Sequence, residues 1–238
     1  MIVWGDVILH LSRTFSDLLG WHPLLDYKRL KVYAEGTFSV GGIEDIWGFV
    51  DGTFRAFCKP SASDEAQQAA YSGHKKLHGQ NWQAIVTPDG LIVLLVGPFF
   101  GPANNWTMWR LSGCKEEIQL VMEGHKMLWV YGDPAYRLSY GVMAPYGAAQ
   151  GRRFLSSRQQ AFNRSLSTVC IAVENAFSMV QRLWTYTAFG KSLSAGKQPI
   201  GAIFAVAVLL TNCHFCLRGN QISEQFGVSP PSVENYLL

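Results

Sequence analysis

Three acidic residues stand where they could share a metal ion. Asp51 follows the apolar run 46–50 and precedes a glycine, and Asp133 follows the apolar run 127–131 and a glycine. If those runs are neighbouring strands, the two carboxylates converge at one end of a sheet, where like charges require a divalent cation or a shared proton. Glu174 lies at the edge of a helical apolar stripe, from which it can bring a third carboxylate to the other two.

This combination of acids suits phosphoryl-transfer chemistry. Three carboxylates on two strand ends and a helix can hold two Mg²⁺ or Mn²⁺ ions, which stabilise the attacking and leaving oxygens of a phosphodiester displacement. An acid at the end of a strand is also a common solvated turn residue. The pattern by itself therefore leaves both interpretations open.

The first half of the chain is patterned as strands. The run 46–50 predicts a short buried strand that ends at the turn residues 51–53. Two β-prone runs, 82–86 and 91–96, flank a Pro-Asp-Gly turn and predict an antiparallel hairpin. The run 127–131 predicts a further buried strand, and the segment from about 106 to 122 has room for a helix.

Helices are expected at the two ends of the chain. Residues 1–20 are patterned as an amphipathic helix within an N-terminal helical segment, 1–40, and the main domain is expected to span 41–238. After residue 151, apolar residues recur at steps of three and four, which predicts a helix with one apolar stripe: Phe162, Leu166, Val169, Val173, Phe177, Val180 and Trp184. The fold class is therefore a mixed α/β domain with a partly antiparallel sheet.

Composition narrows the protein class. The chain has 238 residues, of which 48% are apolar and 16% charged, so it can bury one substantial core. Its net charge of +3 is compatible with a polyanionic partner, and its five cysteines do not form a secreted disulfide framework.

The polar stretch 61–68 is interpreted as a surface loop. The uncharged run 200–210 is interpreted as a buried helix rather than a membrane anchor, because polar residues follow too early for a span.

Other catalytic and metal-binding motifs are weak or missing. The sequence has no His-Glu-x-x-His, no Gly-x-Ser-x-Gly and no phosphate-binding glycine loop. Cys213 and Cys216 form a lone Cys-x-x-Cys, which supplies too few ligands for a closed zinc site and is interpreted as part of an apolar helix.

The acids lie within an ordered series of motifs that resembles the Harbinger-like DDE superfamily endonucleases. The series begins with residues 48–53 (GFVDGT) and 71–78 (YSGHKKLH), followed by the Pro-Asp-Gly hairpin. It continues with residues 132–136 (GDPAY) and the Pro-Tyr of 144–146, and ends with 162–163 (FN) leading to 173–177 (VENAF). Single motifs are unspecific, but five in this order are distinctive, and the resemblance covers about residues 40–238.

This resemblance implies an RNase H-like fold with a mixed sheet flanked by helices, and a catalytic and metal-binding triad of Asp51, Asp133 and Glu174. Such nucleases use Mg²⁺ or Mn²⁺ and attack DNA phosphates with a water and then with a strand's 3′-hydroxyl. The expected function is a transposon-derived DNA endonuclease acting in the nucleus, without a membrane. Five basic residues would be candidates for contacts to the DNA backbone: Lys75, Lys76, His78, Arg152 and Arg153.

The sequence departs from the family pattern at three places. Residues 101–105 end in Asn104 and Asn105 where the family has His-Asp, and Cys170 stands where an arginine is usual. If the second metal-binding acid belongs at position 105 rather than at Asp133, an amide is a poorer ligand for a hard cation. The first forty residues also show no clear helix-turn-helix, so a separate DNA-reading protein would be needed as a partner. The alternative hypothesis is a decayed or domesticated transposase relative that serves as a DNA-binding or protein-binding module.

Overall fold

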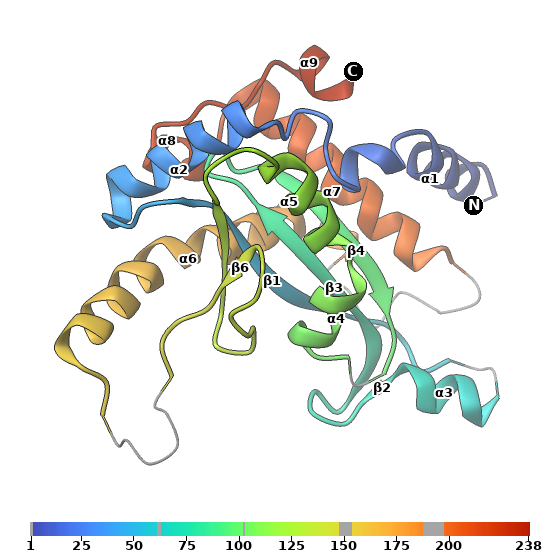
Figure 1. The fold of residues 1–238 in the computed structure, drawn as a ribbon. Helices are drawn as coiled ribbons and strands as arrows, with labels where there is room; N and C mark the ends of the chain where they lie inside the picture. Colours follow the sequence, from blue (N-terminus) through green and yellow to red (C-terminus); the bar gives the residue numbers. More distant parts are fainter. Residues whose placement is uncertain (1, 61–62, 102, 148–153, 188–197) are drawn as a thin grey trace.

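A single mixed sheet forms the centre of the molecule (Figure 1). The computed structural model describes residues 2–60, 63–101, 103–147, 154–187 and 198–238. The strands of this part of the chain are β1 (Ile46–Ala56), β2 (Tyr71–Ser72), β3 (Leu77–Val86), β4 (Ile92–Phe99), β5 (Trp129–Gly132) and β6 (Val142–Met143). Strand β1 is central, with β3 antiparallel on one side and β5 parallel on the other. The sheet continues outward to β4 beyond β3 and to β6 beyond β5.

Helices precede, interrupt and follow the strands. The α-helices of the described chain are α1 (Ile2–Thr14), α2 (Tyr27–Gly41), α3 (Asp64–Ala70), α4 (Asn105–Leu111), α5 (Cys114–Met122), α6 (Ser157–Leu183), α7 (Ile200–Arg218), α8 (Gln221–Phe226) and α9 (Val233–Leu237). Two short 3₁₀ helices, η1 (Ser16–Leu19) and η2 (Thr185–Thr187), follow α1 and α6. Strands β1, β3 and β4 are antiparallel, and β5 and β6 are added in parallel beyond β1. Together with the flanking helices, this mixed sheet is the predicted RNase H-like fold.

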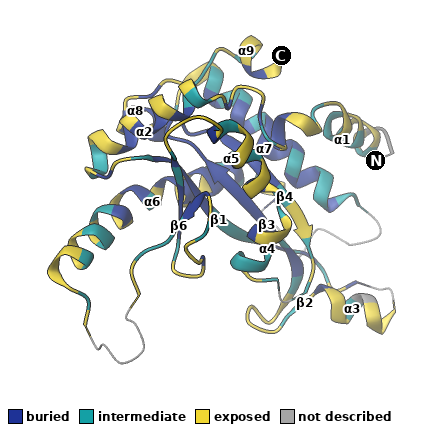
Figure 2. Ribbon diagram, viewed as in Figure 1, coloured by how far each residue is buried: buried dark blue, intermediate teal, exposed yellow. Residues whose placement is uncertain are grey.

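The two faces of the sheet carry different helices. Side chains alternate between faces along a strand. On one face of β1, Phe49 contacts Phe226 of α8, and Arg55 lies over the rings of Phe177 in α6 and Phe204 in α7. On the other face, the bare backbone of Gly52 lies against the beginning of α4. Figure 2 shows the middle of this sheet as buried, whereas the far end of β4 is exposed.

The Pro-Asp-Gly hairpin is confirmed as β3 and β4. Asp89 of its turn is fully buried and accepts hydrogen bonds from Thr87 Oγ1 at 2.6 Å and from the Leu91 backbone N–H at 3.2 Å. Tyr33 Oη at 2.7 Å and Arg29 Nη2 at 2.9 Å, both from α2, donate to its other oxygen. The turn is therefore also the point at which α2 is fixed to the sheet.

The structure corrects three local predictions. Strand β1 does not end at the turn residues 51–53 but continues to Ala56, because β3 pairs with it as far as Gly79 and supplies the backbone hydrogen bonds. The stretch 61–68 is not simply a loop, since Asp64 begins α3, where two acids in the first turn favour a helix start. The helix predicted over 1–20 ends at Thr14 and is followed by η1.

The two long C-terminal helices agree with the sequence pattern. The predicted stripe from Leu166 to Val180 forms the buried side of α6, whereas Phe162 is half-buried and Trp184 lies just beyond the end of the helix. The helix begins with a Ser156 and Gln159 capping box. Helix α7 is long and apolar enough to cross a membrane. However, 56% of its most apolar 18-residue stretch is buried inside the protein. Asn212 of α7 is fully buried and bonds both the N–H and the C=O of Ile92, so α7 packs on β4 as a core helix.

Candidate metal centre

Asp51 lies near the middle of β1, with its side chain on the face that α6 covers. The carboxylate is half-buried, and its Oδ1 accepts two hydrogen bonds. One comes from the backbone N–H of Gly52 at 2.6 Å and the other from Asn105 Nδ2 at 3.3 Å. Both donors go to the same oxygen, so the second oxygen takes part in neither bond.

Asp133 is brought next to Asp51 by the pairing of β1 with β5. The two strands are parallel, and Val50 pairs with Gly132, the residues that directly precede the two acids. Asp133 follows the last residue of β5 and accepts a hydrogen bond from the Ala135 N–H at 3.0 Å, which shapes the turn behind the strand. The two acids therefore follow paired residues, as predicted, but only Asp133 lies at a strand end, since β1 continues past Asp51 to Ala56.

Glu174 lies on the middle of α6 and is exposed. Its neighbours Val173 and Phe177 belong to the buried stripe, so the helix is fixed on the sheet while the carboxylate at the edge of the stripe stays free to change rotamer. Cys170, one turn earlier on α6, is half-buried and points to the same side of the helix as Glu174.

The three carboxylates interact electrostatically. The pKa of Asp51 is raised to about 6, chiefly by burial and also by the negative charges of Asp133 and Glu174. The hydrogen bonds from Gly52 and Asn105 act in the opposite direction. Burial also raises the pKa of the Cys170 thiol to about 12, followed by the charges of Asp51, Glu174 and Asp133. The thiol therefore lies within the field of all three acids.

The donor set suits a hard divalent cation, but the side chains are not gathered around one point. Mg²⁺ and Mn²⁺ prefer carboxylate and carbonyl oxygens, which this site offers. Among the residues that the structure describes, no three His, Cys, Asp or Glu side chains lie close enough to hold one ion. Binding a cation through Asp51, Asp133 and Glu174 together requires these side chains to draw in, and the exposed Glu174 has the most freedom to do so.

Position 105, which the sequence offered as the alternative place for the second metal-binding acid, adjoins Asp51. Asn105 begins α4 beside Gly52, and Asn104 caps the helix through a hydrogen bond to the Thr107 N–H. The side chain of Asn105 passes over Gly52, where an added Cβ would collide with its Oδ1, and reaches Asp51. Both position 105 and Asp133 thus adjoin Asp51, and the sequence could not establish this because α4 and β5 are distant in the chain.

Of the basic residues predicted to contact DNA, the three that the structure describes lie away from Asp51. Lys75 and Lys76 are exposed at the turn between β2 and β3, and His78 lies at the beginning of β3. Ala84 pairs with Asp51, so His78 is six residues away along β3, roughly 20 Å at about 3.3 Å per residue. Arg152 and Arg153 lie outside the described residues.

A cation nearer to the acids was missed by the sequence analysis. Arg137 is exposed four residues after Asp133, and its guanidinium carbon lies 5.9 Å from the centre of the Trp106 ring, next to Asn105. The sequence indicated only a helix around Trp106. Nothing in it paired this tryptophan with the turn behind β5.

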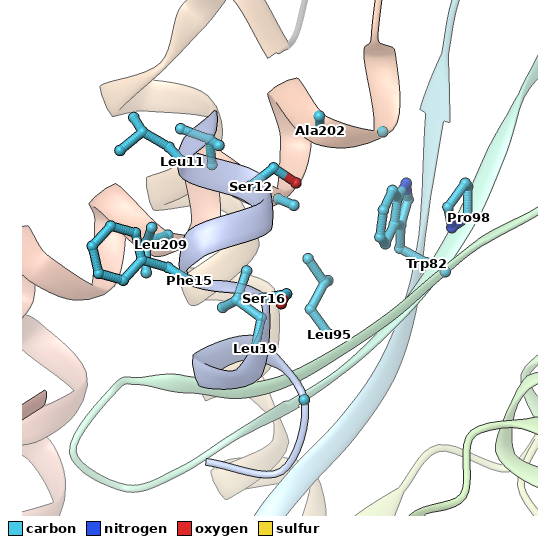
Figure 3. Close-up of a pocket in the computed structure, with 15 residues that line it drawn as sticks. Leu11, Ser12, Phe15, Ser16, Leu19, Trp82, Leu95, Pro98, Ala202 and Leu209 are labelled. Carbon is cyan, nitrogen blue, oxygen red and sulfur yellow. The ribbon is translucent and has the colours of Figure 1, made fainter. Parts of the chain in front are cut away.

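Two other features of the molecule lie away from the acids. An apolar pocket of about 320 Å³ between α1, β4 and α7 is shown in Figure 3, with Leu11, Phe15, Leu95 and Leu209 among its lining residues. None of the three carboxylates lines it. Cys213 and Cys216 are half-buried on α7, the apolar helix that the sequence pattern predicted.

Comparison with known families identifies the class of protein. The family described as DDE superfamily endonuclease matches residues 50–212, well over half of the chain. The matched segment contains the sheet from Val50 onward, all three acids and most of α7. The chain therefore belongs to the DDE superfamily endonucleases. No curated protein and no solved structure gave a significant match.

Proposed function

We propose that the chain is a transposon-derived, metal-dependent DNA endonuclease of the Harbinger type, with Asp51, Asp133 and Glu174 as its metal ligands. The observation that carries this proposal is the parallel pairing of β1 with β5, which brings Asp51 and Asp133 to adjacent positions on one face of the sheet. The contribution of Asp133 and Glu174 to the raised pKa of Asp51 supports it. Family membership supplies the reaction class.

Each acid has a separate task in this proposal. Asp51 is fixed through Oδ1 by Gly52 and Asn105, which leaves its second oxygen to face a cation. Asp133 approaches from the turn behind β5, and Glu174 from the surface of α6. When bound, Mg²⁺ or Mn²⁺ supplies the positive charge that stabilises the attacking and leaving oxygens of a phosphodiester displacement.

DNA is the substrate that the family implies. Arg137 is exposed, follows Asp133 by four residues and lies over Trp106, the neighbour of Asn105, so we propose it as a phosphate contact beside the acids. Lys75, Lys76 and His78 would contact the backbone farther along the duplex, together with Arg152 and Arg153. A separate DNA-reading protein would select the target, and the activity would operate in the nucleus.

The first test is a calorimetric titration of the purified protein with Mn²⁺. We expect wild type to bind, Asp133→Ala to lose binding, and Asp6→Ala, which changes an exposed acid on α1, to bind like wild type. A plasmid cleavage assay with Mn²⁺ should then give nicked product with wild type and none with Asp51→Asn. Wild-type protein that binds no Mn²⁺ and cleaves no DNA would contradict the proposal.

A second candidate function is a disabled relative that keeps the fold for binding DNA or protein. The observation that favours it is the orientation of Asn105, whose amide N–H rather than its oxygen faces Asp51. An N–H group occupies the place that a metal ligand would need, and an amide carries no charge to neutralise a cation.

Asn105→Asp separates the two functions. If the chain is disabled at this position, Mn²⁺ binding is absent in wild type and appears in Asn105→Asp. If Asp133 is the second acid, wild type already binds, and Asn105→Asp only tightens binding by adding a fourth carboxylate. A protein in which Asn105→Asp and wild type both fail to bind would exclude the metal centre altogether.

A further inference from the structure

Gln83 is a fully buried polar side chain beneath the acidic site. It lies in β3, opposite Gly52 of β1, and points to the face that α4 covers. Its Nε2 donates two hydrogen bonds, one to the backbone oxygen of Asn105 at 3.1 Å and one to Tyr136 Oη at 2.9 Å. The two acceptors come from two different segments, the beginning of α4 and the turn behind β5.

Each of these two segments carries a residue of the acidic site. Asn105 donates from its side chain to Asp51 at 3.3 Å. Tyr136 closes the turn that begins at Asp133, through a hydrogen bond from its N–H to the Asp133 carbonyl at 3.0 Å. A continuous path of contacts therefore runs from Asp51 through Asn105, Gln83 and Tyr136 to Asp133.

Close packing restricts the movement of the residues along this path. An added Cβ at Gly132 would press into the ring of Tyr136, and one at Gly52 would collide with the side chain of Asn105. Tyr136 is itself buried, and its pKa is raised well above the usual value by burial first and then by the charge of Asp51.

We propose that Gln83 is a positioning residue that sets the separation of Asp51 and Asp133, an inference that rests on the proposed metal-binding function. Two carboxylates at adjacent strand positions repel each other, and Asp133 lies on a turn that has no strand partner of its own to resist that repulsion. Gln83 belongs to the interior of a paired strand and ties that turn to α4. An amide is required because it is the neutral side chain with two N–H donors.

The physical benefit is preorganisation. Ligands that are already held near their binding positions lose less conformational freedom when a cation binds. Removing the donor also leaves the buried Tyr136 hydroxyl and the half-buried Asn105 carbonyl without this partner, and an unpaired buried polar group costs free energy.

The test compares Gln83→Met, which keeps the length of the side chain but removes both N–H donors, with Gln80→Met. Gln80 lies on the same strand, is 3% exposed, and its Nε2 has no hydrogen-bond partner among the described residues, so it is a matched control for burying methionine in β3. Mn²⁺ affinity is measured by calorimetry, and hydrogen exchange is followed in peptides that cover 104–107 and 133–136.

We expect Gln83→Met to weaken Mn²⁺ binding about tenfold or more, as is common for residues that hold metal ligands in place, and to speed exchange in both segments. Gln80→Met should leave both measurements unchanged. Tyr136→Phe removes one acceptor, so it should weaken binding and speed exchange only in 133–136, and it should add little to Gln83→Met because the two changes break the same bond.

The outcomes separate this inference from the proposed function. Wild-type affinity in Gln83→Met, with wild-type protein binding Mn²⁺ normally, would overturn the positioning role and leave the metal centre intact. Faster exchange with unchanged affinity would make Gln83 a structural residue only, which also overturns the inference. Absence of Mn²⁺ binding in wild type would overturn both.

Discussion

The ionised form of Asp51 is unfavourable in the folded protein when no cation is present. Its carboxylate is half-buried and lies in the field of two further acids, and its pKa is raised to about 6. A raised carboxyl pKa means that the folded state binds a proton more tightly than the unfolded state. Stability contributed by that proton is present at low pH and is lost as the pH rises from about 4 to about 6.

We therefore expect Asp51→Asn to stabilise the metal-free protein at pH 7.5 by up to about 3 kcal/mol, the equivalent of a shift of roughly two pKa units. The amide oxygen can still accept the hydrogen bonds from Gly52 and Asn105. Urea denaturation at pH 7.5 and at pH 4.5 measures the effect, which should shrink at the lower pH. A variant no more stable than wild type at pH 7.5 would contradict this, and Asp6→Asn on the surface of α1 is the control.

Gly52 makes the contact between Asn105 and Asp51 possible. A Cβ at this position would collide with Asn105 Oδ1 and lie 3.0 Å from Cε of Met108. We expect Gly52→Ala to cost about 1–3 kcal/mol of unfolding free energy, as overpacking of a filled site usually does. Thermal denaturation compares it with Gly73→Ala, where nothing lies within 4 Å of the new Cβ and no loss is expected. Equal stability of the two variants would show that α4 can shift to accommodate the added methyl group without a loss of unfolding free energy.

At the scale of elements, two buried polar residues join helices to the sheet. Asp89 joins the β3–β4 turn to α2, and Asn212 joins α7 to β4. The side-chain hydrogen bonds of these two residues link a helix to the sheet, as backbone hydrogen bonds link one strand to the next. The helices that cover the site face are therefore fixed in place by specific bonds as well as by apolar packing.

Asp89→Ala should destabilise the protein by about 3–5 kcal/mol, because it leaves the Arg29 charge and the Tyr33 hydroxyl without their buried partner. Urea denaturation followed by tryptophan fluorescence measures the loss. Lys126→Ala breaks an ion pair with Asp45 at an exposed position and should leave the midpoint nearly unchanged. A small effect of Asp89→Ala would mean that α2 is held by its apolar contacts alone.

At the scale of the whole molecule, the contacts of α7 are those of a core helix rather than of a membrane anchor. Its buried residues include Phe204, Val208 and Phe215, and its Asn212 also donates to Tyr236 Oη at 2.9 Å. A lipid-facing helix has no need for these polar bonds, whereas a core helix that covers a sheet edge depends on them.

We expect wild-type protein to be recovered without detergent, and Asn212→Leu to lose at least about 1–3 kcal/mol of stability because Ile92 keeps two unpaired backbone groups. Cell fractionation and urea denaturation of both proteins test this. For a membrane anchor the result would be the reverse, since Asn212→Leu makes the segment more apolar and would strengthen its retention in the membrane fraction.

The sequence by itself determined the elements whose signals are local. The hairpin follows from two β-prone runs around Thr87-Pro88-Asp89-Gly90, and α6 from apolar residues at helical spacing, because turn chemistry and periodicity depend on near neighbours in the chain. The order of the motifs also indicated the DDE superfamily endonucleases, which the comparison identified, while the Harbinger type stays a prediction. The sequence likewise selected Asp51 and Asp133, since each stands where an apolar run gives way.

Only the tertiary structure decided how these elements meet. Strand β1 extends to Ala56 because β3 pairs with it, and Asp133 lies beside Asp51 because β5 pairs with β1, although 82 positions separate the two acids in the sequence. The approach of Asn105 over Gly52 and the two bonds of Gln83 are likewise long-range contacts. Such pairings depend on the packing of the whole molecule rather than on local preference, so no pattern of neighbouring residues encodes them.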